Sequence, residues 1–176
     1  ADGGTIYMVE ELFTDNPIDP GEIARRELKF VCLQNESMNT HIRGDDIDLM
    51  PPVALEIDGE DNLHNVSAYC ANTGKLLNFA DVYDAEGFDF SGTRSYDEAN
   101  GYRSASMLVI PLEDHENRII GVLQLINRRQ GDGSIGEFTL EDIELVESVS
   151  YPAAAAITTQ RLIDEQVTLF NSFVTL

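Results

Sequence analysis

Four short runs of apolar residues along the chain are typical of β-strands. β-Branched and aromatic residues dominate them, and turn-forming residues bound them. The runs are Thr5–Val9 (TIYMV), Leu28–Leu33 (LKFVCL), Ser106–Leu112 (SMLVIPL) and Ile119–Ile126 (IIGVLQLI). The turn Asp114–Asn117 separates the last two, so we predict that they form an antiparallel hairpin. The first two runs are predicted to pair through a connection that contains the turn residues 16–21.

Two segments carry the start signals of helices. Asn65 precedes the run Val66–Ala71 and can cap a helix there, which the Thr73-Gly74 pair would end. Farther along, Thr139 and Asp142 have the spacing of an acidic capping box, at the start of a long helix.

The order of these elements predicts the fold class. Residues 35–61 are polar and irregular, with one short apolar strand at Val53–Ile57, and Leu76–Asn78 is a short extended piece. Strands come first, polar segments lie in the middle and a helix comes last. This order favours an α+β domain with an antiparallel sheet. A chain of 176 residues suits one domain with a single core.

Charge and composition limit the classes of molecule that this protein is expected to bind. The net charge of −21 disfavours nucleic acid and anionic membranes as partners. No apolar run approaches the roughly 20 residues that span a bilayer. Cys32 and Cys70 are too few for a disulfide scaffold, and we interpret them as buried free thiols of a cytosolic protein. Because the chain begins with Ala close to a strand, we interpret it as a piece of a longer protein.

Known catalytic motifs do not occur in the sequence. There is no phosphate-binding Walker loop, no Gly-x-Ser-x-Gly and no His-Glu-x-x-His. His41, His64 and His115 lack the spacing of metal ligands. We therefore predict a domain with no catalytic residues and no metal site.

The segment Phe88–Leu112 (FDFSGTRSYDEANGYRSASMLVIPL) is rich in hydroxyls directly before a predicted buried strand. Such chemistry suggests a lid over a small-molecule pocket, where apolar walls carry a few polar groups. The alternative is a surface loop capped by its own Asx and Ser/Thr turns. The polar candidates are Asn78, Asp81, Ser91, Thr93, Asp97, Asn100 and Ser104, and the apolar ones are Phe79, Phe88 and Phe90.

Several motifs together resemble a GAF domain, in the order that this family has and over nearly the whole chain. They are GGTIY at 3–7, ANTGKLLNFAD at 71–81, GYRSASML at 101–108 and IGVLQLIN at 120–127. The resemblance implies a six-stranded antiparallel sheet with helices on its back and a ligand pocket on its other face. A helix usually precedes the first strand in this family, and this chain lacks it. Bilin attachment and the methionine sulfoxide reductase activity of some relatives are disfavoured, because their cysteine patterns are absent.

The cyclic-nucleotide-binding branch of the family implies particular ligand contacts. They are Leu33 and Gln34 at the end of the second strand, Val66 and Ser67 at the start of a helix, Asp97, Asn100 and Ser104 in the lid, and Gln124 in the central strand.

The same branch has an Asn-Lys…Phe-x-x-x-Asp-Glu signature whose Lys and Asp form an ion pair. Here Arg128 replaces the Lys, and we expect it to pair with Asp142. Ile143 stands in place of the final Glu. Helix capping is an alternative role for Asp142, and both roles can hold.

The resemblance implies a non-enzymatic sensor. FDFSGTR followed by GYRS is similar to GAF domains of bacterial signalling proteins, which often precede HD-GYP phosphodiesterases or nucleotide cyclases. Residues 169–176 resemble the linker that enters an HD-GYP domain. We expect a cytoplasmic sensor at 1–159, followed by a helix at 160–176 that leads to an output domain. No cofactor is required, and a cyclic nucleotide is the candidate ligand. The alternative is a ligand-free module for dimerisation and signal transmission.

The predicted C-terminal helix carries an apolar stripe with alternating steps of three and four residues, as in a coiled coil. We expect its first half, with Pro152 as a point of kinking, to pack on the sheet. From Gln160 onward the stripe would pair with a second copy in a parallel homodimer. The alternative is an ordinary helix folded onto its own domain. The stripe consists of Val146, Val149, Ala153, Ala156, Gln160, Ile163, Val167, Phe170 and Val174.

Overall fold

The computed structural model describes residues 1–13, 23–43 and 50–174. Six strands form one antiparallel sheet in the order β3-β2-β1-β9-β8-β7, and β4 pairs with β2 beside this row. Their bounds are β1 Gly3–Phe13, β2 Ile23–Asn35, β3 Thr40–Arg43, β4 Val53–Ala54, β7 Leu77–Phe79, β8 Met107–Glu113 and β9 Ile119–Ile126. The fold is α+β, as predicted.

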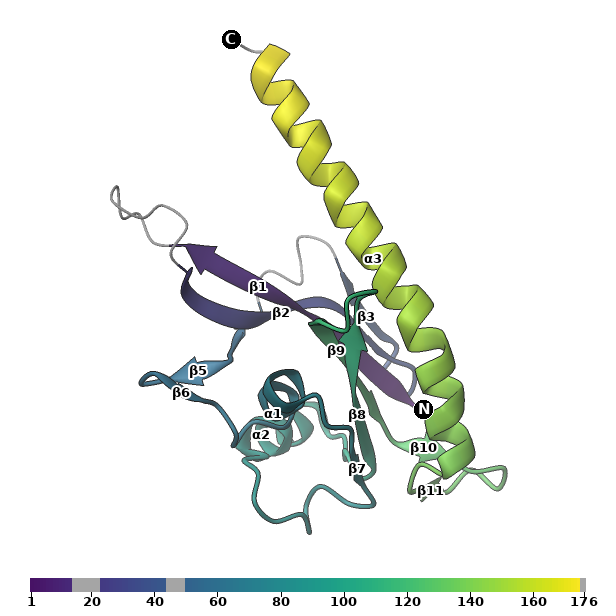
Figure 1. Ribbon diagram of the computed structural model, residues 1–176. Helices are drawn as coiled ribbons and strands as arrows, with labels where there is room; N and C mark the ends of the chain where they lie inside the picture. The colour runs from purple at the N-terminus through teal and green to yellow at the C-terminus, as the bar shows by residue number, and fades with distance from the viewer. Residues whose placement is uncertain (14–22, 44–49, 175–176) are drawn as a thin grey trace.

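The described residues also contain three helices and two small hairpins (Figure 1). The helices are α1 Val66–Thr73, α2 Ser91–Asn100 and α3 Leu140–Val174. The hairpins are β5 Glu56–Ile57 with β6 Glu60–Asp61, and β10 Arg128–Arg129 with β11 Ile135–Gly136.

The four main predicted strands and the start of each predicted helix are confirmed. Asn65 caps α1 by accepting hydrogen bonds from Ser67 N and Ala68 N. The predicted strand Val53–Ile57 is wrong as a single element, because Leu55 separates β4 from β5. The connection at 16–21 lies outside the described residues.

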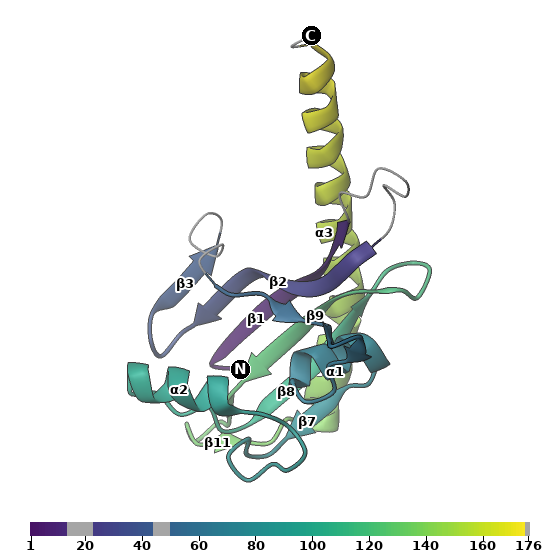
Figure 2. The same cartoon turned by 90° about the vertical axis from the view of Figure 1, so that its left-hand side faces the viewer.

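The two faces of the sheet carry different cores. Met107 and Val109 of β8 pack in the cluster that includes α1, whereas Leu108 and Ile110 pack with α3 residues on the opposite face. Figure 2 shows α1 and α2 on one side of the sheet and α3 on the other. The expectation that the helices lie on the back therefore holds for α3 alone among the described helices.

The central pairing of β1 with β9 requires a glycine. A Cβ at Gly121 would lie 2.3 Å from the Tyr7 carbonyl oxygen, closer than atoms can approach. A side chain at this position would therefore push β9 away from β1 and disrupt the sheet that supports both cores.

The lid is the largest difference from the sequence prediction. Residues 91–100, expected as part of an irregular loop, form the helix α2. Its C-cap is Gly101, which adopts φ 62°, a conformation that glycine reaches without strain. Phe90 stands at the N-cap and provides no side-chain hydrogen bond, so the usual local start signal of a helix is missing.

Helix α3 runs without a break through Pro152. The residues on its sheet-facing side include Val146, Ser150 and Ala154, the last of which is fully buried. Ala153 and Ala156 of the predicted stripe are exposed, so the expectation that they pack on the sheet is wrong. At 3.6 residues per turn, Ala153 lies about 100° and Ala156 about 160° around the helix from the buried Ala154.

The Asp114 carboxylate in the β8–β9 turn makes the stability of the protein depend on pH. Asp114 accepts hydrogen bonds from Arg118 N (3.0 Å), Glu116 N (2.8 Å) and Arg118 Nε (2.8 Å). These contacts, the backbone bond from Arg118 above all, lower the pKa of Asp114 to about 2. A lowered pKa in the folded state means that the stabilisation is complete above the unfolded value of about 3.9.

We expect Asp114→Asn to lower the melting temperature at pH 7. The difference from the wild type should shrink as the pH falls from about 4 toward 2, where the native carboxylate also becomes protonated. Thermal melts at a series of pH values measure it. A difference that is constant down to pH 2 would contradict this assignment.

Candidate ligand-binding site

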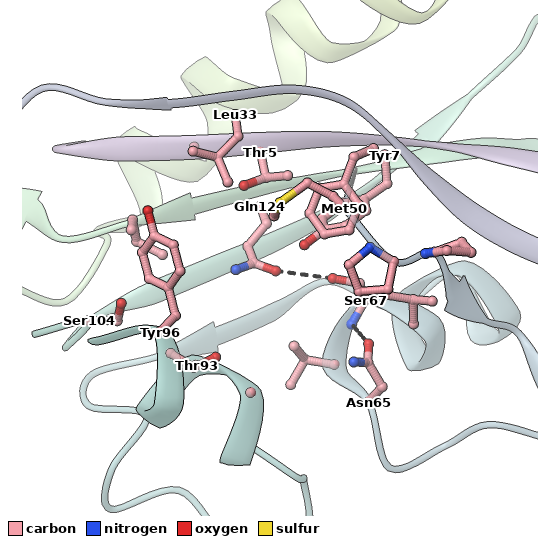
Figure 3. A pocket seen from close by; sticks show the side chains of 18 of the residues that line it. Thr5, Tyr7, Leu33, Met50, Asn65, Ser67, Thr93, Tyr96, Ser104 and Gln124 are labelled. Carbon is pink, nitrogen blue, oxygen red and sulfur yellow. Dashed lines mark hydrogen bonds between the residues drawn. The ribbon is translucent and has the colours of Figure 1, made fainter. Parts of the chain in front are cut away.

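A cavity of about 500 Å³ lies between the sheet, α1 and α2. Its floor comes from β1, β2 and β9, and its sides come from the first turns of both helices and from residues 50–53 (Figure 3). The lining consists of Gly4, Thr5, Tyr7, Phe30, Leu33, Gln34, Asn35, Met50, Pro51, Pro52, Val53, Asn65, Val66, Ser67, Asp89, Ser91, Gly92, Thr93, Tyr96, Ser104, Gln124 and Ile126.

A polar bridge crosses the floor from α1 to the central strand. The Ser67 hydroxyl donates to Gln124 Oε1 at 3.0 Å. Burial raises the pKa of the neighbouring Tyr7 to about 12, although the hydroxyls of Ser67 and Thr5 act in the opposite direction. Tyr7 therefore presents a neutral hydroxyl at any physiological pH, and the floor is uncharged.

Among the hydrogen-bond donors that face the cavity, Gln124 Nε2 and the Tyr96 hydroxyl have no partner among the described residues. Because Gln124 Oε1 accepts from Ser67, its Nε2 is directed toward α2 (Figure 3). Tyr96 rises from α2 toward the sheet on the same side of the cavity. The Tyr96 hydroxyl and Gln124 Nε2 can thus donate to acceptor atoms of a bound molecule.

The first turns of the helices differ in what they offer. The resemblance implies that backbone amides at the start of α1 face a phosphate or base edge of a ligand. The amides of Ser67 and Ala68 do not, because both already donate to Asn65 Oδ1. At α2, Asp89 accepts from Ser91 N at 2.8 Å. Hydrogen bonds from Ser91 lower the pKa of Asp89. Among the described residues that line the cavity, Asp89 alone carries a charge near pH 7.

Helix α2 is held in place by the buried carboxylate of Asp97. Its Oδ2 accepts from Ser104 N (2.7 Å) and from the Tyr83 hydroxyl (3.0 Å), and its Oδ1 accepts from the Ser104 hydroxyl (2.9 Å). Asp97 is 1% exposed. Since Ser104 donates its proton to Asp97, its hydroxyl can only accept a hydrogen bond from a ligand.

The structure brings eight of the sequence-predicted contacts to the cavity, namely Leu33, Gln34, Val66, Ser67, Ser91, Thr93, Ser104 and Gln124. The other seven lie elsewhere. Phe79, Phe88 and Phe90 pack edge-to-face against one another in the core beneath the lid.

The four remaining polar candidates make structural contacts. Asn78 Nδ2 donates to the Phe138 carbonyl oxygen at 2.9 Å. Asp81 pairs with Arg103 at 2.8 Å, and Asp97 anchors α2. Asn100 is exposed and donates to the Tyr96 carbonyl at 2.8 Å.

Sequence reasoning missed several lining residues, including Thr5, Tyr7, Phe30 and Tyr96. A period of two along β1 could have found the first two, because alternate residues of a strand share a face. Tyr96 had no such signal, since it faces the cavity only because residues 91–100 are helical.

The expected pairing of Arg128 with Asp142 is present in the structure. The same Asp142 oxygen accepts from the amide and the hydroxyl of Thr139, each at 2.7 Å. Asp142 therefore takes part in the helix cap and the ion pair at once. Burial is the largest influence on this carboxylate and acts to raise its pKa, but hydrogen bonds from Thr139 and Arg128 outweigh it, so the pKa is lowered.

Other reactive groups are few. Among the described residues, no cluster of three His, Cys, Asp or Glu could hold a metal ion, and no helix has the length and apolarity needed to cross a membrane. Cys70 is buried and free, whereas Cys32 is free but only half-buried. Burial raises the pKa of Cys70 to about 12, so its thiol is unreactive.

The chain matches the GAF domain family over residues 2–157 and belongs to that family. GAF domains are regulatory sensing domains. The chain is 32% identical over 87 residues to dual 3',5'-cyclic-AMP and -GMP phosphodiesterase 11A of Takifugu rubripes, a stretch that covers 49% of this chain and 9% of that protein. It is 31% identical over 67 residues to dual phosphodiesterase 11 of Drosophila melanogaster, with 38% and 4% covered. The chain thus spans less than a tenth of the length of these relatives.

Solved structures show the same fold. The GAF domain of a phosphoenolpyruvate-protein phosphotransferase from Coxiella burnetii superposes with a TM-score of 0.59 over 94% of this chain and 76% of that chain. The two sequences are 12% identical, so the likeness concerns the fold alone.

The anchor of α2 can be tested by a single substitution. In Asp97→Asn the amide nitrogen cannot accept the hydrogen bonds that now reach one carboxylate oxygen. We expect a loss of about 1–3 kcal/mol in the free energy of unfolding and faster amide exchange across residues 91–100. The matched control is Glu98→Gln, which removes the same charge from an exposed neighbour. Equal effects of the two substitutions would contradict an anchoring role.

Proposed function

We propose that the chain is a small-molecule-sensing regulatory domain of a bacterial signal-transduction protein, with the ligand bound beneath α2. The observation that carries this proposal is the cavity itself. The Tyr96 hydroxyl and Gln124 Nε2 face it without a partner among the described residues, and a neutral floor lies below them. Such an arrangement fits a ligand that brings its own acceptor atoms.

A cyclic mononucleotide is the ligand class that we favour. A volume of about 500 Å³ suits a single nucleotide, and Tyr7, Phe30 and Tyr96 supply aromatic surface for its base. Because no Lys or Arg stands among the described residues that line the cavity, ligands with several phosphates are less suited. The partial match to cyclic nucleotide phosphodiesterases supports the same class.

We place the sensor in residues 1–159 and assign 160–176 to a helix that leads to a cytoplasmic output domain. The similarity of residues 88–104 and 169–176 to proteins with HD-GYP domains supports a cyclic-di-GMP phosphodiesterase as this output. Sensing and hydrolysis would then reside in different domains.

A ligand-free role in dimerisation and signal transmission is the second candidate. The bond from Ser67 to Gln124 favours it, because this bond satisfies part of the floor without a ligand. The two candidates differ in whether the purified domain holds or takes up a small molecule.

Calorimetric titration with cyclic GMP and cyclic AMP tests the binding proposal. We expect Tyr96→Phe and Gln124→Leu each to weaken binding by about tenfold, because each loses one buried hydrogen bond. Asn100→Ala should bind as the wild type does, since this side chain is exposed outside the lining. Absence of binding by the wild type, with no small molecule in its native mass spectrum, would favour the ligand-free role.

We also propose a parallel homodimer through α3. The apolar stripe is exposed along the helix from Val149 onward, and Ile163, Val167 and Phe170 continue it. A stripe with a seven-residue repeat drifts slowly around a straight α-helix. When two such helices wrap around each other, the supercoil keeps the two stripes in contact. The exposed Ala153 and Ala156 would allow a close approach of the partner.

Sedimentation of two matched variants tests this seam. Val149 and Tyr151 are 54% and 53% exposed but lie on opposite sides of α3. Val149→Glu should shift the chain toward the monomer at micromolar concentration, and Tyr151→Glu should not. A chain that ends at Thr159 should also dissociate more readily. If the wild type is itself a monomer, the seam does not form in this chain.

A further inference from the structure

The segment that leaves α2 is bound to a single asparagine. Asn127 is 3% exposed and has φ 54°. Its Nδ2 donates to the Tyr102 hydroxyl (2.8 Å) and the Arg103 carbonyl (2.7 Å), and its Oδ1 accepts from Ala105 N (2.7 Å). Its own amide donates to the Ser106 carbonyl at 2.8 Å. The backbone from 102 to 106 therefore cannot move without displacing Asn127.

Tyr102 is fixed from a second direction. Its hydroxyl donates to Asp2 Oδ2 at 2.6 Å. Asp2 is 4% exposed and also accepts from Ser37 and from Arg129. The Tyr102 hydroxyl is thus held between Asp2 and Asn127. A shift at the end of α2 is therefore passed on to these two residues and is not absorbed by rotation of the Tyr102 ring.

The residue after Asn127 connects this cluster to α3. Arg128 N donates to the Ser106 hydroxyl at 3.0 Å, and its guanidinium binds the Asp142 carboxylate. That carboxylate is the cap of α3, because it also accepts from Thr139 N and Thr139 Oγ1. Figure 1 shows β10 beside the first turns of α3.

We propose that Tyr102 and Asn127 are positioning residues that couple α2 to the start of α3. When α2 moves, the segment 102–106 moves Asn127. The adjacent Arg128 then shifts relative to the Asp142 carboxylate oxygen that caps α3. The contacts run without a gap from the lid to the helix that leaves the domain. The proposal rests on the proposed function, because ligand binding beneath α2 would supply the movement.

Hydrogen exchange without any ligand tests the coupling by itself. Tyr102→Phe removes one hydroxyl, and Asn127→Gly removes the side chain while keeping the positive φ accessible. We expect amide exchange at residues 139–146 to rise by about threefold to tenfold in each variant. Unchanged exchange at 139–146 in both variants, with 102–106 affected, would overturn the proposal.

The matched control is Tyr83→Phe. It also removes a tyrosine hydroxyl from the surroundings of α2, because Tyr83 donates to Asp97, but it touches neither Asn127 nor Arg128. We expect faster exchange within α2 and wild-type exchange at 139–146. An equal rise at 139–146 would show that general loosening of α2 suffices, and the assignment to Tyr102 and Asn127 would be wrong.

A double variant separates coupling from independent damage. In Tyr102→Phe with Arg128→Gln, exchange at 139–146 should rise no more than in the larger single variant, because both changes interrupt one path. Fully additive effects would overturn the proposal. Near-UV circular dichroism of each variant verifies that the core stays packed.

Cyclic GMP serves as the probe for the link to ligand binding. If it protects the cavity residues and residues 139–146 in the wild type, Tyr102→Phe should keep the first protection and lose the second. Retention of both would overturn the proposal. Failure of cyclic GMP to bind contradicts the proposed ligand alone, since the ligand-free exchange measurements decide the coupling.

Discussion

The alternation of side chains across the central strands is the constraint on which the rest of the structure depends. In β8, Met107 and Val109 face the cavity side, and Leu108 and Ile110 face α3. The same period of two directs Gln124 of β9 into the cavity. Because Gly121 lets β1 approach β9 closely, one sheet supports a binding site on one face and a helix on the other. A register slip of one residue would exchange the two faces.

The lid shows how tertiary contacts can create a helix that local signals do not support. Gly92, Thr93 and Ser95 are poor helix formers, and the N-cap residue offers no side-chain bond. The buried Asp97 compensates by binding Ser104 and Tyr83 from within the helix. A helix held mainly by one polar anchor is among the least stable parts of a domain. Such an element suits a lid, because a modest free energy can shift it.

The sequence predicted the parts of the fold that depend on local pattern. The strands, the β8–β9 hairpin and both capping signals follow from periodicity and from single residues such as Asn65 and Thr139. Prediction failed where distant contacts decide. The lid helix was read as a loop, and Ala153 and Ala156 were assigned to the sheet-facing side of α3. A heptad pattern indicates which residues share a face of a helix, but it does not indicate whether that face packs against the sheet.

The candidate site shows the same division. Residues at strand and helix ends, such as Gln34 and Ser67, reach the cavity because their elements were placed correctly. Asp97 was expected to touch a ligand but does not line the cavity, and its carboxylate already has donors on both oxygens. A buried carboxylate with such partners gains more from holding the lid than from facing solvent. Polar residues in a lid therefore divide into those that meet the ligand and those that hold the lid, and only the positions of their partners distinguish the two.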